Sequence, residues 1–194
     1  MSSRDRILNT VKQNQPATTE LPAIINYDQK YANVVEKFIE VLRFIGGAVI
    51  LVKNYEQVIN IIKENFGEAK RIVSTCKELT SIAEAAAPVN DPHQLANVDL
   101  FVAQSNLAVA ENGAIWVKDD QLQERALAFI SQQIAVVVNK ENIVATMHDA
   151  YDIIADVDYG YAAFIAGPSK TADIEQSLVL GAHGPKTMTV FLMS

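Results

Sequence analysis

The sequence is poor in the side chains that most often bind transition metals. It has one cysteine, Cys76, so the chain forms no internal disulfide and holds no cysteine-ligated iron–sulfur cluster or zinc finger of its own. Among its three histidines, His148 stands four residues before Asp152, but a solvated acidic helix face is the simpler interpretation of that spacing. We therefore expect no metal site and no iron–sulfur cluster in this chain, and the sequence names no other cofactor.

Long hydrophobic runs are also missing. The most apolar stretches, residues 45–52 and 134–138, are far shorter than the roughly 20 residues that span a bilayer. Residues 1–8 mix both signs of charge and contain no apolar run of signal-peptide length. We expect no membrane span and a cytoplasmic location, where a lone cysteine stays reduced.

Basic and aromatic residues are both scarce. There are 16 Lys and Arg against 23 Asp and Glu, a net charge of -7. Nucleic acids and anionic membranes attract clustered positive charge, so neither is an expected partner. Small molecules and proteins are the expected partners, and a homo-oligomer is compatible with the sequence. Aromatics make up 7% of the chain and hydrophobic residues 49%, which predicts an aliphatic core.

The chain divides into an N-terminal extension and one domain. Residues 2–14 have helical spacing of apolar side chains after Ser2 or Ser3, either of which can cap a helix. This helix is a candidate arm for a partner subunit. Residues 15–28 contain two prolines and no sustained period, which indicates an extended linker. Residues 29–194 are then long enough for a single α/β domain.

Short aliphatic runs alternate with helical periods after a first helix at residues 29–45. This alternation is typical of a mainly parallel sheet flanked by helices. Strands are predicted at residues 48–52, 71–74, 98–102, 107–110, 114–117, 134–138, 161–166 and 187–193, and helices at residues 54–66, 76–86, 126–131, 143–154 and 171–180. Ligands of such sheets bind where strands end, and the polar strand ends are residues 167–173, 110–113 and 74–77.

The segment 167–173 has the densest polar chemistry of the three. Gly167 opens a turn, and Ser169 or Thr171 would start the following helix, whose exposed amides can hold an anion. Lys170 would attract that anion and Asp173 would order the loop. The glycine spacing excludes a Walker phosphate loop. The simpler alternative is that these residues only cap a helix and complement its dipole.

Two further residues are candidates for catalysis. Glu111 stands in a turn where Gly113 is expected to have a positive φ angle, and a carboxylate presented there can act as a nucleophile or base. Its alternative is an exposed hairpin acid. His183 lies between Gly181 and Gly184, where it can transfer protons or cap a helix.

The C-terminal segment resembles the signature of a known family. Residues 167–175 read Gly-Pro-Ser-Lys-Thr-Ala-Asp-Ile-Glu, and residues 178–181 and 183–185 continue the motif. They are similar to the LUD-domain family, the lactate utilization protein C proteins. Residues 110–113 and 134–138 are similar to that family's inner segments, and the resemblance covers residues 40–193. The chain departs from the family pattern at Lys170, Asn112 and Gln133, where arginine, threonine and histidine are usual.

The resemblance implies a fold of the NagB, ribose-5-phosphate isomerase and CoA-transferase type. It also implies a part in the oxidation of L-lactate to pyruvate beside separate iron–sulfur subunits. Our leading hypothesis is a non-redox accessory subunit that binds a small anionic metabolite or nucleotide at the carboxyl ends of the strands. One alternative is a CoA-transferase or ligase that uses Glu111, since the Glu111-Asn112-Gly113 turn resembles that of CoA-transferases. Another is a purely structural partner of the iron–sulfur subunits.

Overall fold

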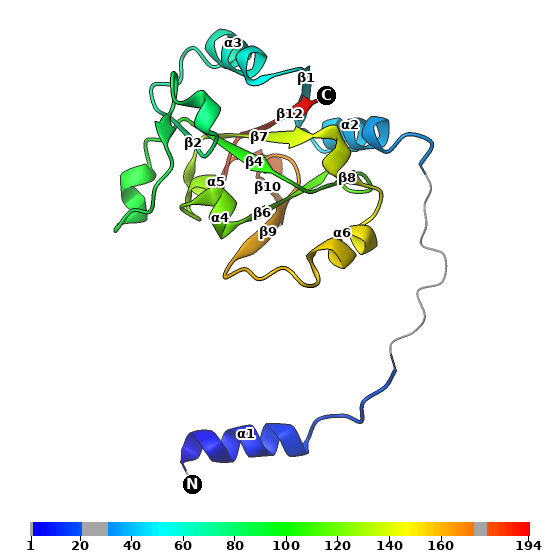
Figure 1. The fold of residues 1–194 in the computed structure, drawn as a ribbon. Coiled ribbons are helices and arrows are strands. Elements are labelled where there is room, and N and C mark those ends of the chain that lie inside the picture. The colour runs from blue at the N-terminus through cyan, green and yellow to red at the C-terminus, as the bar shows by residue number, and fades with distance from the viewer. Residues whose placement is uncertain (1, 21–30, 173–177) are drawn as a thin grey trace.

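The computed structural model describes residues 2–20, 31–172 and 178–194 (Figure 1). Its first helix, α1 (Ser3–Gln13), confirms the helix predicted at residues 2–14. The Ser2 side chain accepts from the Asp5 amide and the Asp5 carboxylate accepts from the Ser2 amide, so a capping box starts the helix. None of its residues is buried, and α1 stands away from the other helices and strands in Figure 1.

A six-stranded parallel sheet forms the centre of the molecule. Its strand order is β1-β12-β7-β4-β2-β3. The strands are β1 (Ala48–Val52), β2 (Ile72–Ser74), β3 (Glu84–Ala85), β4 (Leu100–Ser105), β7 (Gln133–Asn139) and β12 (Thr187–Met193). The middle strands are runs of aliphatic residues because both of their faces are buried. The predicted mainly parallel sheet is therefore confirmed.

Helices and a second, smaller sheet cover the two faces. The face bearing Val102 and Phe191 packs against α3 (Tyr55–Asn65), while the face bearing Ile134 and Val136 packs against α2 (Val34–Phe44) and the second sheet. That sheet has the order β8-β5-β6-β9. Its strands are β5 (Ala108–Val109), β6 (Ala114–Lys118), β8 (Ile143–Val144) and β9 (Ala162–Ile165). The remaining helices are α4 (Asp119–Leu122), α5 (Leu127–Ile130) and α6 (Met147–Ile154).

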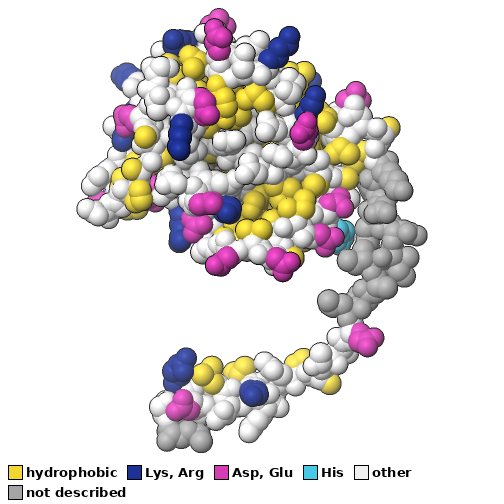
Figure 2. Space-filling view, in the orientation of Figure 1, with side chains coloured by type: hydrophobic (Ala, Val, Ile, Leu, Met, Phe, Trp, Pro, Cys, Tyr) yellow, Lys and Arg dark blue, Asp and Glu magenta, His cyan; other side chains and the backbone are white. Residues whose placement is uncertain are grey.

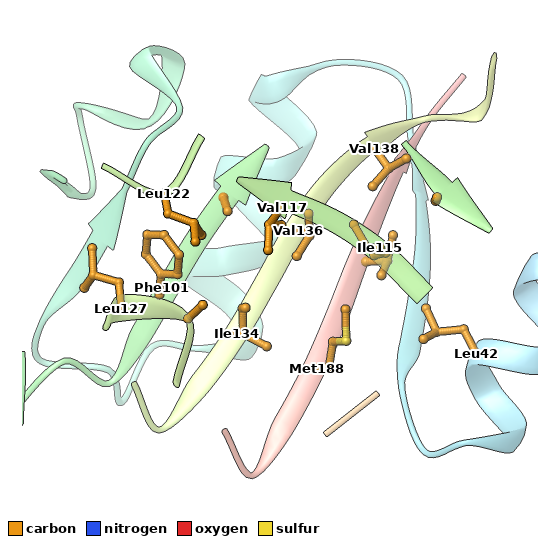
Figure 3. Packing of buried hydrophobic residues seen from close by; sticks show 14 of the residues in the cluster. Leu42, Phe101, Ile115, Val117, Leu122, Leu127, Ile134, Val136, Val138 and Met188 are labelled. Atoms are coloured by element: carbon orange, nitrogen blue, oxygen red, sulfur yellow. The ribbon is translucent and has the colours of Figure 1, made fainter. Parts of the chain in front are cut away.

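The two sheets meet through the inner face of β6. Figure 3 shows Ile115 and Val117 of β6 lying over Val136 and Met188 of the parallel sheet. Trp116, which stands between them on β6, points away from the parallel sheet, and its ring centroid lies 4.7 Å from that of Phe164. Alternation along one strand thus builds two separate apolar clusters.

Three predicted helices differ in the structure. Residues 76–86 form only a 3₁₀ helix, Lys77–Leu79, followed by β3, because the Thr80-Ser81-Ile82 run has low helix propensity. The helix expected from residue 143 starts at Met147, after β8. The helix predicted at residues 171–180 is wrong: β10 (Lys170–Ala172) and β11 (Leu178–Leu180) pair as an antiparallel hairpin, in which Thr171 lies opposite Val179. Such β-branched residues favour strands.

The surface carries charges of both signs, as the composition of the chain predicts. On the face shown in Figure 2, acidic and basic side chains are interspersed, with no continuous basic area. Within the described ranges, no helix is long and apolar enough to cross a membrane. The domain boundary at residue 28 stays a prediction, since residues 21–30 are outside the described part of the chain.

The stability of the fold should depend on β4 far more than on exposed apolar groups. Phe101→Ala removes a fully buried ring at the sheet centre and should lower the free energy of unfolding by about 3–5 kcal/mol. Phe44→Ala, which removes the same atoms from a residue that is 89% exposed, should change it by less than about 0.5 kcal/mol. Urea unfolding measures both, and equal losses would contradict the placement of the core.

Candidate functional site

The candidate site lies beside the carboxyl end of α2, which contacts several of its residues. The Gly47 amide donates to the Leu42 carbonyl (2.8 Å) and the Gly46 amide donates to the Arg43 carbonyl (3.0 Å). Gly46 has a φ of 92°, so this end is a Schellman motif closed by a left-handed glycine. The chain then enters β1 directly.

Two glycines that flank strands of the second sheet pack closely against this helix end. Gly113 and Gly167 have φ angles of 69° and 73°, which confirms the positive φ predicted for Gly113. Because Ile115 pairs with Ile165, the two glycines leave neighbouring ends of β6 and β9. A methyl group on Gly113 would lie 3.1 Å from Cδ1 of Ile45, and one on Gly167 would lie 3.0 Å from the Ile45 carbonyl oxygen. Both positions therefore need glycine for conformation and for close packing.

Lys170 completes the contact with α2. Its ammonium group donates to the Ile45 carbonyl oxygen, one of the carbonyls that a helix leaves unpaired at its end. An ammonium has three N–H donors, so two remain for another acceptor. The charge of Lys170 is thus held at a fixed place although the residue is exposed.

Beside Lys170 lies a hollow of about 300 Å³, which we call the amino-edge hollow. Gly167, Ser169, Lys170 and His183 line it together, so the structure brings four of the predicted site residues to one place. Apolar side chains form the rest of the wall, among them Phe129, Ile134, Phe164 and Pro185.

Backbone hydrogen bonds fold the loop around this hollow. The Ser169 amide donates to the Pro185 carbonyl (2.9 Å), and the Gly181 amide donates to the Ser169 carbonyl (3.1 Å). A methyl group on Gly184 would lie 3.1 Å from Cβ of Ser169. Ser169 is therefore fixed at the base of the loop, half-buried, while His183 is exposed at its rim.

The position of this hollow corrects the sequence-based prediction. Pro185 precedes β12, and the Lys186 amide donates to the carbonyl of Gln132, just before β7 (2.8 Å). The hollow therefore lies at the amino ends of the parallel strands, not at their carboxyl ends. The reason is that β9 belongs to the second sheet, and Gly167 after it lies against Ile45, which stands just before β1.

The helix start expected to hold an anion is also absent from the described residues. Thr171 is in β10, and its hydroxyl donates to the Val179 carbonyl at 3.4 Å, across the hairpin. Asp173 lies outside the described residues. Any anion at this hollow would be held by side chains, chiefly Lys170 and Ser169.

Glu111 is not brought into the same hollow. Its side chain is exposed, and its amide donates to the Ala145 carbonyl at 3.1 Å. The turn places Gly113 against α2 and leaves the carboxylate of Glu111 at the surface. Its role as a nucleophile or base stays a prediction.

A second and larger hollow, of about 490 Å³, lies at the carboxyl edge of the parallel sheet. It includes the predicted strand end, residues 74–77, and polar residues that sequence reasoning missed: Gln104, Asn106, Gln121 and Gln123. The polar run at residues 104–106, at the end of the apolar strand β4, is the signal that could have found the first two. We call this the carboxyl-edge hollow.

The thiol in this hollow is buried and neutral. Cys76 is 4% exposed, and burial raises its pKa. Burial also raises the pKa of Tyr55, whose hydroxyl is hydrogen-bonded to that thiol. Because a thiol is a weak nucleophile when protonated, the structure does not favour Cys76 for covalent chemistry. Residues 2–20, 31–172 and 178–194 contain no cluster of His, Cys, Asp and Glu suited to a metal ion.

The architecture, a parallel α/β sheet with a second sheet packed on one face, is that of a known family. The family model described as LUD domain matches residues 77–193, and the chain belongs to this family. A DUF162 family protein from Deinococcus radiodurans, of known crystal structure, shares the fold with a TM-score of 0.65 at 18% identity, over 83% of this chain and 96% of that chain.

Several relatives bear the name lactate utilization protein C, and two of them show the extent of the similarity. The Oceanobacillus iheyensis protein is 29% identical over 49% of this chain and 43% of its own length. The Anoxybacillus flavithermus protein is 27% identical over 77% of this chain and 64% of its own length. The matches thus span less than two thirds of either relative.

Substitution of Gly167 tests the packing at the α2 end. Gly167→Ala should lower the free energy of unfolding by about 2 kcal/mol or more, because it adds a left-handed alanine and a contact with a fixed carbonyl. The neighbouring Ala166→Gly exchange should cost only about 0.5–1 kcal/mol. Urea unfolding compares the two, and a smaller loss for Gly167→Ala than for Ala166→Gly would refute the assigned packing.

Proposed function

We propose that this protein is an accessory component of an L-lactate oxidation system that binds a small anionic metabolite in the amino-edge hollow. Its membership of the LUD domain family and its similarity to proteins named lactate utilization protein C support this role. The substrate of the system or its product, a three-carbon carboxylate, is the ligand we assign to the hollow.

The observation that carries the proposal is the joint placement of Ser169, Lys170 and His183 around one 300 Å³ hollow. The Lys170 ammonium, anchored on the Ile45 carbonyl, has donors left for a carboxylate. The Ser169 hydroxyl can donate a second hydrogen bond to the same ligand. Phe129 and Pro185 would cover the apolar part of the ligand.

Oxidation of lactate to pyruvate removes two electrons and two protons. With a single cysteine, this chain cannot ligate an iron–sulfur cluster by itself, so we assign the electrons to separate iron–sulfur subunits. We assign to His183 the transfer of a proton to or from the bound hydroxy acid, because its imidazole stands at the rim of the hollow. Thr171 and Asp173 would support the loop rather than contact the ligand.

Exchange of Lys170 separates ligand binding from folding. Lys170→Met keeps the length of the side chain but removes its charge, and it should weaken binding of L-lactate or pyruvate about tenfold or more. Lys170→Arg keeps the charge and should retain most of the affinity, while Lys63→Met on α3 should bind normally. NMR titration of the purified variants measures each dissociation constant, with the amides of residues 167 and 169–171 as reporters.

Growth on L-lactate of a strain that depends on this protein gives the functional readout. At normal protein levels, Lys170→Met should abolish growth while the iron–sulfur subunits still co-purify. Normal growth of Lys170→Met would overturn the ligand site. Loss of growth together with loss of the assembly would instead favour a purely structural role.

A further inference from the structure

The carboxyl-edge hollow is separate from the site just proposed. Ser74 of β2 pairs with Val102 of β4, so the two strands end at the same edge, and residues 75–77 and Asn106 follow them there. In open parallel sheets this edge is where ligands bind, because chain segments diverge above the strand ends. The amino-edge hollow lies at the opposite ends of these strands.

The size of the carboxyl-edge hollow indicates a ligand larger than a three-carbon acid. Its volume of about 490 Å³ falls within the range of roughly 300–1,000 Å³ found for sites of drug-sized ligands and cofactors. A lactate ion would leave most of that space to water. A nucleoside with one phosphate is of suitable size.

The polar lining includes four carboxamides with unused hydrogen-bonding groups, beside hydroxyl and charged side chains. The side chains of Gln104 and Asn106 make no hydrogen bond to any other described residue, so each offers both a donor and an acceptor. Gln121 uses its carbonyl oxygen to accept from the Lys118 amide, and its NH₂ group remains. Gln123 donates its NH₂ group to the Asp120 carbonyl, and its oxygen remains.

One buried hydroxyl in the same wall lacks a strong hydrogen-bond partner. Oγ1 of Thr75 is inaccessible to solvent, and within the described structure its only possible partner is a weak one, the neighbouring Cys76 thiol. A buried polar group without a partner costs about 1–3 kcal/mol, so such a group is usually satisfied by a ligand or water. By contrast, the neighbouring Ser74 hydroxyl donates to the Val102 carbonyl at 2.9 Å and accepts from the Cys76 amide.

The lining carries two carboxylates, each paired with a base outside the hollow, and one cation, Lys77, that has no such partner. Glu84 is paired with Arg71 (3.1 Å) and Asp120 with Lys118 (2.7 Å). Lys77 is exposed at the hollow and forms no ion pair with any residue in the described ranges. Its ammonium is therefore available for one anionic group.

Small apolar side chains complete the wall. Ala83, Ala85 and Ala86 line the hollow on the segment around β3. Methyl groups leave room for a flat ring and can pack against its face, as apolar side chains do around a nucleobase. A carboxamide can bond the adenine edge in two places, accepting from the exocyclic amine and donating to the ring nitrogen beside it.

We propose that the carboxyl-edge hollow binds an adenine nucleotide. The base packs against the alanines, its edge bonds the carboxamides of Gln104 and Asn106, and its phosphate binds Lys77. The ligand is either free AMP or the AMP half of a larger adenine-containing cofactor, since both present the same chemistry to these residues. This site does not depend on the lactate role, because the two hollows share no residue.

Calorimetric titration of the full chain with AMP tests the proposal. Wild-type protein should bind AMP, and the double variant Gln104→Ala/Asn106→Ala should bind it about tenfold or more weakly. Lys77→Ala should weaken AMP binding but leave adenosine binding unchanged. Lys53→Ala and Ser169→Ala should bind AMP as wild type does, and circular dichroism checks that each variant is folded.

Titrations with NAD and ribose 5-phosphate show whether the ligand is free AMP or part of a larger cofactor, and whether the adenine base is recognised. Tighter binding of NAD than of AMP would assign the AMP half of a larger cofactor, and equal binding would assign the free nucleotide, both of which support the proposal. Ribose 5-phosphate should bind at least tenfold more weakly than AMP. Equal affinity for ribose 5-phosphate, or no heat of binding with about 10 mM AMP, would overturn the adenine site whatever the result with L-lactate.

Discussion

The contact of two left-handed glycines with the carboxyl end of α2 is the constraint on which the rest of the structure depends. Gly113 and Gly167, at the ends of β6 and β9, lie so close to Ile45 that a methyl group added to either would be 3.0–3.1 Å from an Ile45 atom. Lys170 then binds the Ile45 carbonyl. One helix end therefore fixes the second sheet, the entry to β1 and the loop at the amino-edge hollow.

The amino-edge and carboxyl-edge hollows lie at opposite ends of the same parallel strands. The amino-edge hollow is small and has a cation held by α2, which suits a short carboxylate. The carboxyl-edge hollow is larger and is lined by carboxamides and alanines. Buried residues of β4 and β7 lie between the two hollows. Substitutions in one hollow should therefore leave the other unchanged.

Local patterns in the sequence predicted the parts of the fold that local chemistry determines. The aliphatic run at residues 134–138 is a buried strand, the helix predicted at residues 54–66 is α3, and the Asn-Gly turn gives Gly113 its positive φ. The motif at residues 167–185 was also sufficient to indicate the LUD domain family. These features depend on neighbours along the chain and on strong residue preferences.

Long-range pairing decided the parts that could not be predicted. Residues 170–172 and 178–180 have a helical pattern of polar and apolar residues, yet they pair with each other as strands. The edge on which Ser169 and Lys170 lie depends on β9 joining β6, a pairing between residues 50 positions apart at Ile115 and Ile165. The polar run at residues 104–106 marks Gln104 and Asn106 as candidates, but only the pairing of β2 with β4 brings them beside residues 74–77.

Hydrogen exchange of an Ile45→Ala variant, followed by mass spectrometry, tests most directly whether the end of α2 holds the site together. Removal of the Ile45 side chain should speed exchange in residues 110–114 and 165–171 together, while β7 and β12 keep their protection. Phe44→Ala, a neighbouring exposed residue, should leave all of these segments unchanged. If faster exchange in Ile45→Ala stays within residues 42–47, the two segments are held independently and the account is wrong.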